Sequence, residues 1–159
     1  MTPTPTPTTR LPRHLATAVL VLLASTIGML ADQAGTSPVK IFILAGQSNM
    51  QGHGEMFPLT TPGTLEYTVA NDPGGDYQFV SDGSGGWTAW DDVWIHYERD
   101  ASTVLAGNLT AGYGEANTTI GPELGFGSVV GGHYDNQVLL IKAAWGGKSL
   151  AVDFRPPSS

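Results

Sequence analysis

Two apolar runs of strand length, each ending in glycine, constrain this chain more than any other feature. The first is VKIFILAG, residues 39–46, and the second is QVLLIKAAWGG, residues 137–147. A run that is apolar at successive positions is typical of a central parallel strand, which is buried on both faces. The carboxyl ends of parallel strands meet at one edge of a sheet, where open α/β folds bind their ligands. We therefore expect both glycine turns to lie on one rim.

The residues between the two runs predict a long insertion and one helix. Residues 51–120 are rich in Gly, Pro, Asp and Thr and have only short apolar pieces, of which DDVWIHYE, residues 91–98, predicts an edge strand or a hairpin. PELGFGSVV, residues 122–130, has a proline at its start and an acidic first turn, which favours a helix. GGHYDN, residues 131–136, predicts the turn that leaves this helix. The order strand, turn, insertion, helix, strand predicts an α/β fold with a parallel sheet.

The first 34 residues predict a leader that is separate from the domain at 35–159. MTPTPTPTTR is a Pro-Thr repeat without apolar surface to bury, and basic residues then precede the apolar run 15–31. A basic segment, an apolar segment and small residues follow one another in this order in signal peptides, so we expect a secreted or periplasmic protein. The apolar run is nearly long enough to span a bilayer, so an uncleaved membrane anchor is the alternative.

Charge and composition exclude several classes of function. The formal net charge is −7 and no basic run offsets it, so general electrostatics will not hold nucleic acid or an anionic lipid surface. The chain has no cysteine, which excludes disulfides, thiolate catalysis and cysteine-ligated metal. His53 and Glu55 have the H-x-E spacing of zinc deaminases, but the P-C-x-x-C segment that completes that site is missing. We expect no metal and no cofactor.

The turn after the first apolar run, GQSNM at residues 46–50, places a serine directly behind a predicted strand. A nucleophilic serine needs an exposed position on a sharp turn, and Gly46 would allow the backbone to bend there. The N–H of Ser48 could then point into an oxyanion hole. The alternative is that Ser48 caps a helix that begins near Met50. Spacing alone favours the cap, since Gly-x-Ser is common and the G-x-S-x-G pattern of lipases is absent.

Three stretches taken together resemble a known family. IFILAGQSNMQGHGE resembles the first block of the SGNH/GDSL hydrolases, and more narrowly the sialate O-acetylesterase-like branch, also called the SASA domain and grouped with carbohydrate esterase family 6. IGPELGFG, residues 120–127, is similar to the G-P-E helix segment of this branch, and IKAAWGGKSL, residues 141–150, to its later strand. The resemblance implies a three-layer α/β/α fold with a parallel sheet.

The same resemblance implies a serine esterase that removes acetyl groups from carbohydrate hydroxyls without a cofactor. Ser48 matches the nucleophile. The oxyanion hole of the superfamily uses the serine N–H and a glycine N–H, and Gly147 matches that glycine best, with Gly146 and Gly121 as rivals. A further donor usually lies in a Q-G-E segment, which is not found in this sequence.

Three neighbouring side chains are expected to contact the acetylated carbohydrate substrate. Gln47 and Asn49 flank Ser48, where they either face the substrate or hold the turn through hydrogen bonds to the backbone. Trp145 ends the second predicted strand beside its glycine turn, where it either lines the pocket or packs at the rim.

The base that the family uses is a histidine in a D-x-x-H segment, where the Asp orients the ring. No such segment occurs here, because Asp153 is the last Asp and no histidine follows it. The family pattern gives no role to His53 or His96, and His133 lies in a predicted turn. The residues therefore predict a C-terminally truncated hydrolase whose catalytic Asp and His lie beyond residue 159.

Loss of a triad member costs several orders of magnitude in rate, so we expect the chain alone to be a feeble esterase or none. A secreted carbohydrate-binding remnant without chemistry is the alternative function, and a gene fragment that does not fold is a third reading. Trp87, Trp90 and Trp94 in the insertion bear on this choice. They predict either a platform for sugar rings or, with more weight, a small core of the insertion itself.

Overall fold

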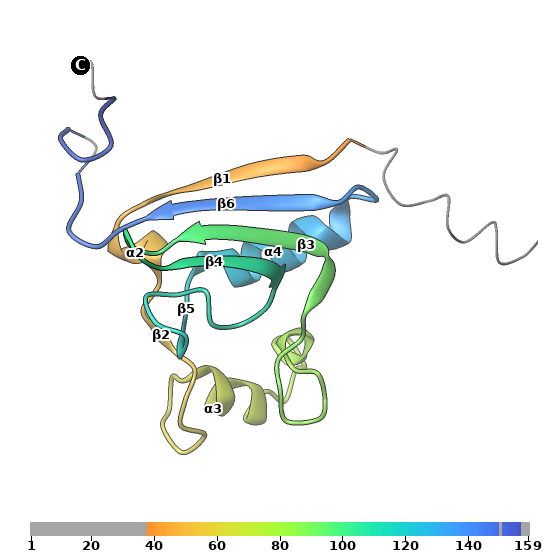
Figure 1. Cartoon of the computed structure of the whole chain (residues 1–159). Coiled ribbons are helices and arrows are strands. Elements are labelled where there is room, and N and C mark those ends of the chain that lie inside the picture. The colour runs from red at the N-terminus through yellow and green to blue at the C-terminus, as the bar shows by residue number, and fades with distance from the viewer. Residues whose placement is uncertain (1–37, 150, 157–159) are drawn as a thin grey trace, which may run out of the picture. The chain divides into compact units, whose positions relative to one another are not determined.

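The computed structural model describes residues 38–149 and 151–156, so the predicted leader at 1–34 lies outside the described residues. Its main sheet has four strands (Figure 1). In spatial order these are β1 (Lys40–Gly46), β6 (Val138–Ala144), β3 (Trp90–Glu98) and β4 (Val104–Leu109). The first three run parallel and β4 runs antiparallel to β3, so this is a mixed sheet of an α/β fold and is not wholly parallel.

Both apolar runs form strands, and they lie side by side. β1 pairs with β6 over its whole length, and the pairing ends at Gly46 opposite Ala144. The expected meeting of the two glycine turns at one rim is confirmed, because both turns follow this last pair. The expectation that the first run is a central strand is wrong for the described sheet. β1 is an edge strand, and the side chains of Ile41 and Ile43 are 57% and 71% exposed.

The apolar piece in the insertion has a more central place than its sequence indicates. β3 forms the predicted hairpin with β4, but it is not an edge strand, since its other side pairs with β6. Val93, Ile95 and Tyr97 are fully buried at alternate positions of β3, while Trp94 between them is 49% exposed. This alternation is the pattern of a strand with one covered and one open face.

The predicted helix is α4 (Pro122–His133), and it is longer than its sequence suggests. Gly131 and Gly132 were expected in a turn but belong to the helix. The reason is packing: a Cβ on Gly131 would lie 2.5 Å from Cγ2 of Val93, and one on Gly127 would lie 2.9 Å from Cδ1 of Leu140. These two glycines therefore let α4 approach the sheet closely, a use of glycine that differs from turn formation.

The insertion contains further short elements that the sequence did not predict. A helix, α3 (Leu65–Ala70), begins where the hydroxyl of Thr64 accepts a hydrogen bond from the N–H of Tyr67. A small second sheet pairs β2 (Gly54–Glu55) with β5 (Thr119–Ile120). The remaining element of the insertion is a 3-10 turn (Gln78–Val80), and the one-turn helix α2 (Ser48–Gln51) precedes the insertion. Because β2 and β5 join the two ends of the insertion, α4 begins next to the segment that follows α2.

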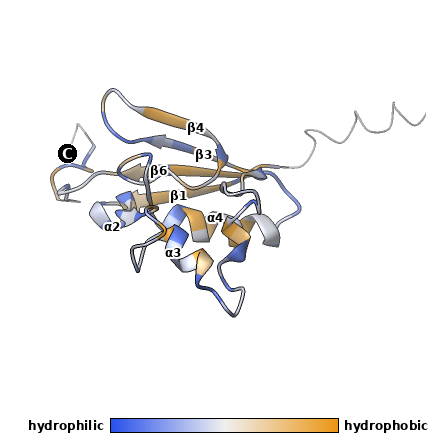
Figure 2. Ribbon diagram, turned by 90° about the horizontal axis from the view of Figure 1, so that it is seen from below, coloured by the Kyte–Doolittle hydropathy of each residue, from blue (hydrophilic) through white to orange (hydrophobic). Residues whose placement is uncertain are grey.

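The helices gather on one face of the main sheet (Figure 2). α4 packs on β3 and β6, and α2 packs on the ends of β1 and β6. The core on this face consists of Leu44, Val93, Ile95, Leu109, Val138 and Leu140. No helix among the described residues is long and apolar enough to cross a membrane.

Candidate active site

The serine turn lies at the carboxyl end of β1. The strand ends at Gly46, Gln47 is the residue before the helix, and Ser48 is the first residue of α2. Ser48 does not cap this helix, since it lies inside the turn, and Gln47 forms no side-chain cap either. The Ser48 side chain is partly exposed, and its hydroxyl has no hydrogen-bond partner in the described part of the chain. The hydroxyl is therefore free to meet a ligand.

Two of the glycines around this turn lie close to side chains of α2. A Cβ on Gly46 would lie 2.7 Å from Cβ of Met50, so only glycine lets α2 fold back over the end of β1. A Cβ on Gly146 would lie 2.8 Å from Oε1 of Gln51. The second glycine turn therefore lies against the end of α2. The N–H of Trp145 also donates to the carbonyl of Gly46 over 3.3 Å, which ties the two turns together.

The three glycines considered for the oxyanion hole differ in what their N–H groups do. The N–H of Gly121 donates to Oε1 of Glu123 over 2.8 Å, so it is already occupied. The N–H groups of Gly146 and Gly147 form no hydrogen bond in the described residues. Gly147 has φ +71°, and no atom lies within 4 Å of a Cβ built on it. Gly147 therefore combines an unoccupied donor with open space, and Gly121 does not.

The side chains expected to contact substrate are placed in different ways. Gln47 and Asn49 are both exposed, and within residues 38–149 neither side chain bonds to the turn backbone, so they do not hold the turn in that manner. Trp145 is partly buried, and its ring packs on Phe154 with the ring centres 5.4 Å apart. The tryptophan thus packs at the rim, beside the glycine turn.

The segment after the second glycine turn is fastened by one carboxylate. Asp153 accepts from Nζ of Lys148 over 3.1 Å and from the N–H of Ser149 over 2.8 Å. The Ser149 N–H, and to a smaller extent the Lys148 ammonium, lower the pKa of Asp153. These contacts hold the loop around Gly147 in a compact turn on the exposed rim.

None of the described histidines stands beside Ser48 as a base. His53 and His96 are exposed, and neither side chain forms a hydrogen bond in the described residues. His133 ends α4, near the beginning of β6, whereas Ser48 lies at the strand ends. Its ring contacts Tyr134 with centres 4.7 Å apart. The structure therefore does not bring a histidine and Ser48 together.

The tryptophans of the insertion do not form one group. Trp90 packs against the main core, and Trp94 lies on the open face of the sheet, 49% exposed. Trp87 lies against Phe57 with ring centres 6.3 Å apart and lines a cavity of about 230 Å³ with Glu66. Neither a shared platform nor a single small core describes them.

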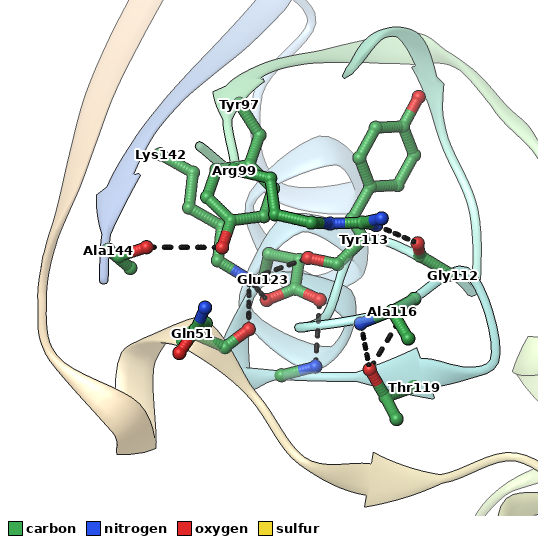
Figure 3. Close-up of polar contacts among 11 residues, drawn as sticks. Gln51, Tyr97, Arg99, Gly112, Tyr113, Ala116, Thr119, Glu123, Lys142 and Ala144 are labelled. Atoms are coloured by element: carbon green, nitrogen blue, oxygen red, sulfur yellow. Dashed lines mark hydrogen bonds and ion pairs between the residues drawn. The ribbon is translucent and has the colours of Figure 1, made fainter. Parts of the chain in front are cut away.

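A buried ion pair next to Gln51, the last residue of α2, is not predicted from the sequence (Figure 3). Lys142 of β6 and Glu123 of α4 are 2.6 Å apart, and both side chains are fully buried. The ammonium also donates to the carbonyls of Gln51, over 2.9 Å, and Tyr113, over 2.7 Å. Its three donors are thus satisfied, and it lies 4.6 Å from the ring centre of Tyr97. A lysine inside the apolar run VLLIKAA was the one available signal.

Two opposing effects act on the ammonium of this pair. Burial lowers the pKa of Lys142 most, while the charge and hydrogen bond of Glu123 raise it. Burial likewise raises the pKa of the Tyr97 hydroxyl, which donates to the carbonyl of Ala144 over 3.1 Å. The Tyr97 hydroxyl therefore holds the carboxyl end of β6 through Ala144.

Among residues 38–149 and 151–156, no group of His, Asp and Glu is arranged to hold a metal ion.

Comparisons with known proteins agree with the sequence resemblance. The protein-family model that matches is SASA, described as a carbohydrate esterase, sialic acid-specific acetylesterase, and it covers residues 38–158. Searches of curated proteins and of solved structures gave no significant match. The family model covers the whole sheet, α4 and both glycine turns. The chain therefore belongs to the SASA family of carbohydrate esterases.

Proposed function

We propose that this domain is a serine esterase that removes O-acetyl groups from carbohydrates, with Ser48 as its nucleophile. The observation that carries the proposal is the Ser48 hydroxyl itself, which is unpartnered and partly exposed at the strand-end rim. In the reaction its Oγ attacks the acetyl carbonyl carbon, and the sugar oxygen leaves with a proton. Water then hydrolyses the acetyl-serine to acetate.

The oxyanion of the tetrahedral intermediate would be bound by the N–H groups of Ser48 and Gly147. Ser48 is the first residue of α2, and N–H groups in a first helical turn have no partner within the helix. The Gly147 N–H is likewise unoccupied among the described residues. Preorganised backbone donors of this kind are worth about 10²–10³ in rate each. Gln47, Asn49 and Trp145 are proposed to border the acetylated sugar.

The base and its orienting Asp are proposed to come from outside this chain. The three described histidines support this, because none of them forms a hydrogen bond with Ser48. The domain at 35–159 would then be the N-terminal part of a three-layer α/β/α hydrolase. The apolar open face of the sheet at Ile41, Ile43 and Trp94 supports a further layer there. We also propose that residues 1–34 direct export, or anchor the protein in a membrane.

The proposal is tested by measuring acetate release from 4-nitrophenyl acetate and from acetylated xylan, with the full chain and with Ser48→Ala. We expect slow turnover, far below the roughly 10 s⁻¹ that is common for enzymes, because the base is not supplied. This slow turnover should disappear in Ser48→Ala. Equal rates for both proteins would refute Ser48 as the nucleophile. A normal enzymatic rate that needs Ser48 would show that a base lies within the chain.

A further inference from the structure

The one-turn helix that carries Ser48 cannot hold its own conformation. α2 has four residues, and its backbone bonds run from Gln51 N–H to Gln47 over 2.7 Å and from Gly52 N–H to Ser48 over 3.0 Å. A helix this short is unstable in isolation, since nucleation costs more than two hydrogen bonds return. Gln47, the residue before α2, forms no side-chain hydrogen bond that caps the helix. The position of Ser48 must therefore be fixed by contacts from other elements.

Lys142 provides such a contact at the end of α2. The carbonyl of Gln51 belongs to the last helical residue, where carbonyls have no partner within the helix. The ammonium of Lys142 donates to it over 2.9 Å (Figure 3). A cation at a helix C-terminus is also favoured by the helix dipole. Because Lys142 lies on β6, two residues before the strand ends, this contact ties α2 to the sheet.

Glu123 connects the same ammonium to the start of α4. One carboxylate oxygen binds Lys142 over 2.6 Å, and the other accepts the N–H of Gly121 over 2.8 Å. Gly121 in turn touches the residue after α2, since a Cβ on Gly52 would lie 2.6 Å from its backbone nitrogen. The end of α2, the start of α4 and β6 thus meet at one ion pair.

Stability alone does not explain a fully buried ion pair. Taking two charges out of water costs free energy that their attraction often only offsets, so an apolar pair of similar volume is commonly as stable. The contacts of this pair point to another role. We propose that Lys142 and Glu123 are positioning residues that fix the Ser48 turn against β6 and α4. This inference rests on the proposed function for its relevance to catalysis, but its structural part is independent.

The first test measures hydrogen exchange in the full chain carrying Lys142→Met together with Glu123→Leu. We expect the Gly52 amide, which donates to Ser48, to exchange about tenfold to a hundredfold faster, the equilibrium effect of losing a hydrogen bond to a charged group. Core amides of β3 should be unchanged. If the ion pair only stabilised the whole fold, the double variant would lower the free energy of unfolding and so speed the exchange of all slowly exchanging amides. Lys40→Met, at the opposite end of β1, is the control. It should change neither the exchange of the Gly52 amide nor that of the β3 core amides. Unchanged Gly52 exchange in the folded double variant would overturn the proposal.

The second test measures the rate at which a fluorophosphonate modifies Ser48, with imidazole present as an external base. The Oγ–P bond forms, fluoride leaves, and the hydroxyl proton passes to imidazole. We expect the rate to fall about tenfold or more in the double variant and to stay unchanged in Lys40→Met. Equal rates would count against positioning. If the native chain is not modified at Ser48 at all, the proposed esterase function fails, and the exchange measurement alone decides the positioning role.

A measurement on the native chain covers the case in which the double variant does not fold. If the ammonium of Lys142 is held as the structure shows, its Nζ protons exchange slowly with water. They should also show scalar couplings through hydrogen bonds to the carbonyl carbons of Gln51 and Tyr113 in NMR spectra. An ammonium that exchanges at the rate of a free lysine side chain would overturn the proposal.

Discussion

The glycines of α4 lead to a sharp prediction, because the same substitution should have opposite effects at two positions two residues apart. Gly127 is buried, and a Cβ there would overlap a methyl group of Leu109 and lie 2.9 Å from Cδ1 of Leu140. Both leucines are fully buried, so neither has free space into which to move. Gly125 is exposed, and nothing lies within 4 Å of its Cβ position.

The magnitudes follow from two effects. Replacing Gly with Ala inside a helix stabilises by about 0.8–1 kcal/mol through propensity, and this term is the same at both positions. Overpacking of a core by one methyl group costs about 1–3 kcal/mol, and this term applies only at Gly127. Gly125→Ala should therefore raise the free energy of unfolding by up to about 1 kcal/mol. Gly127→Ala should lower it by about 0–2 kcal/mol.

The difference in free energy of unfolding between Gly125→Ala and Gly127→Ala tests the packing most directly, because the helix-propensity contribution cancels. It should be about 1–3 kcal/mol, measured by urea unfolding followed by circular dichroism and tryptophan fluorescence. If both variants change stability by the same amount, α4 does not approach the sheet through Gly127. The packing of α4 that places Glu123 against Lys142, next to the end of α2, would then be wrong.

Three further predictions concern single polar groups. Lys142→Met alone should cost about 3–5 kcal/mol in urea unfolding, because it leaves Glu123 buried without its partner; a cost below about 1 kcal/mol would contradict full burial. The hydroxyl and N–H of Ser102 hold the pKa of Asp100 at about 2, below its ordinary 3.8. The stability that the Asp100 carboxylate contributes through its hydrogen bonds to Ser102 is therefore present above about pH 4 and lost as the pH falls toward 2. A midpoint near 4 in a ¹³C titration of the Asp100 carboxyl would contradict this. Tyr97→Phe should cost about 0.5–1.5 kcal/mol in urea unfolding, and a neutral effect would contradict the buried bond to the β6 carbonyl.

The sequence predicts those parts of the fold that depend on local pattern. The runs at 39–46 and 137–147 become β1 and β6, since mostly apolar runs of this length that end in glycine are typical of buried strands. Pro122 marks the start of α4 correctly. The meeting of the two glycine turns also follows, because parallel strands must end on the same rim.

Features that depend on tertiary contacts were not predictable in the same way. Gly131 was expected in a turn, but it packs on Val93, a residue that no local pattern links to it. The interior place of β3 depends on its pairing with β6, across a separation of more than forty residues. The candidate active site likewise contains residues that local pattern identifies and residues that depend on tertiary contacts. Ser48 is found from its motif, whereas Lys142 and Glu123 are recognised as partners only when β6 and α4 are in place.

The reaction of Ser48 with a fluorophosphonate tests whether this residue is the nucleophile. The native full chain, in buffer with imidazole, would be incubated with the reagent, digested and examined by mass spectrometry. We predict one phosphonyl adduct on the peptide that contains Ser48. The adduct should be absent in Ser48→Ala and in the urea-unfolded chain, because reactivity depends on the folded turn. No adduct at Ser48, or equal labelling of the unfolded chain, would show that Ser48 is not an activated nucleophile of the folded protein.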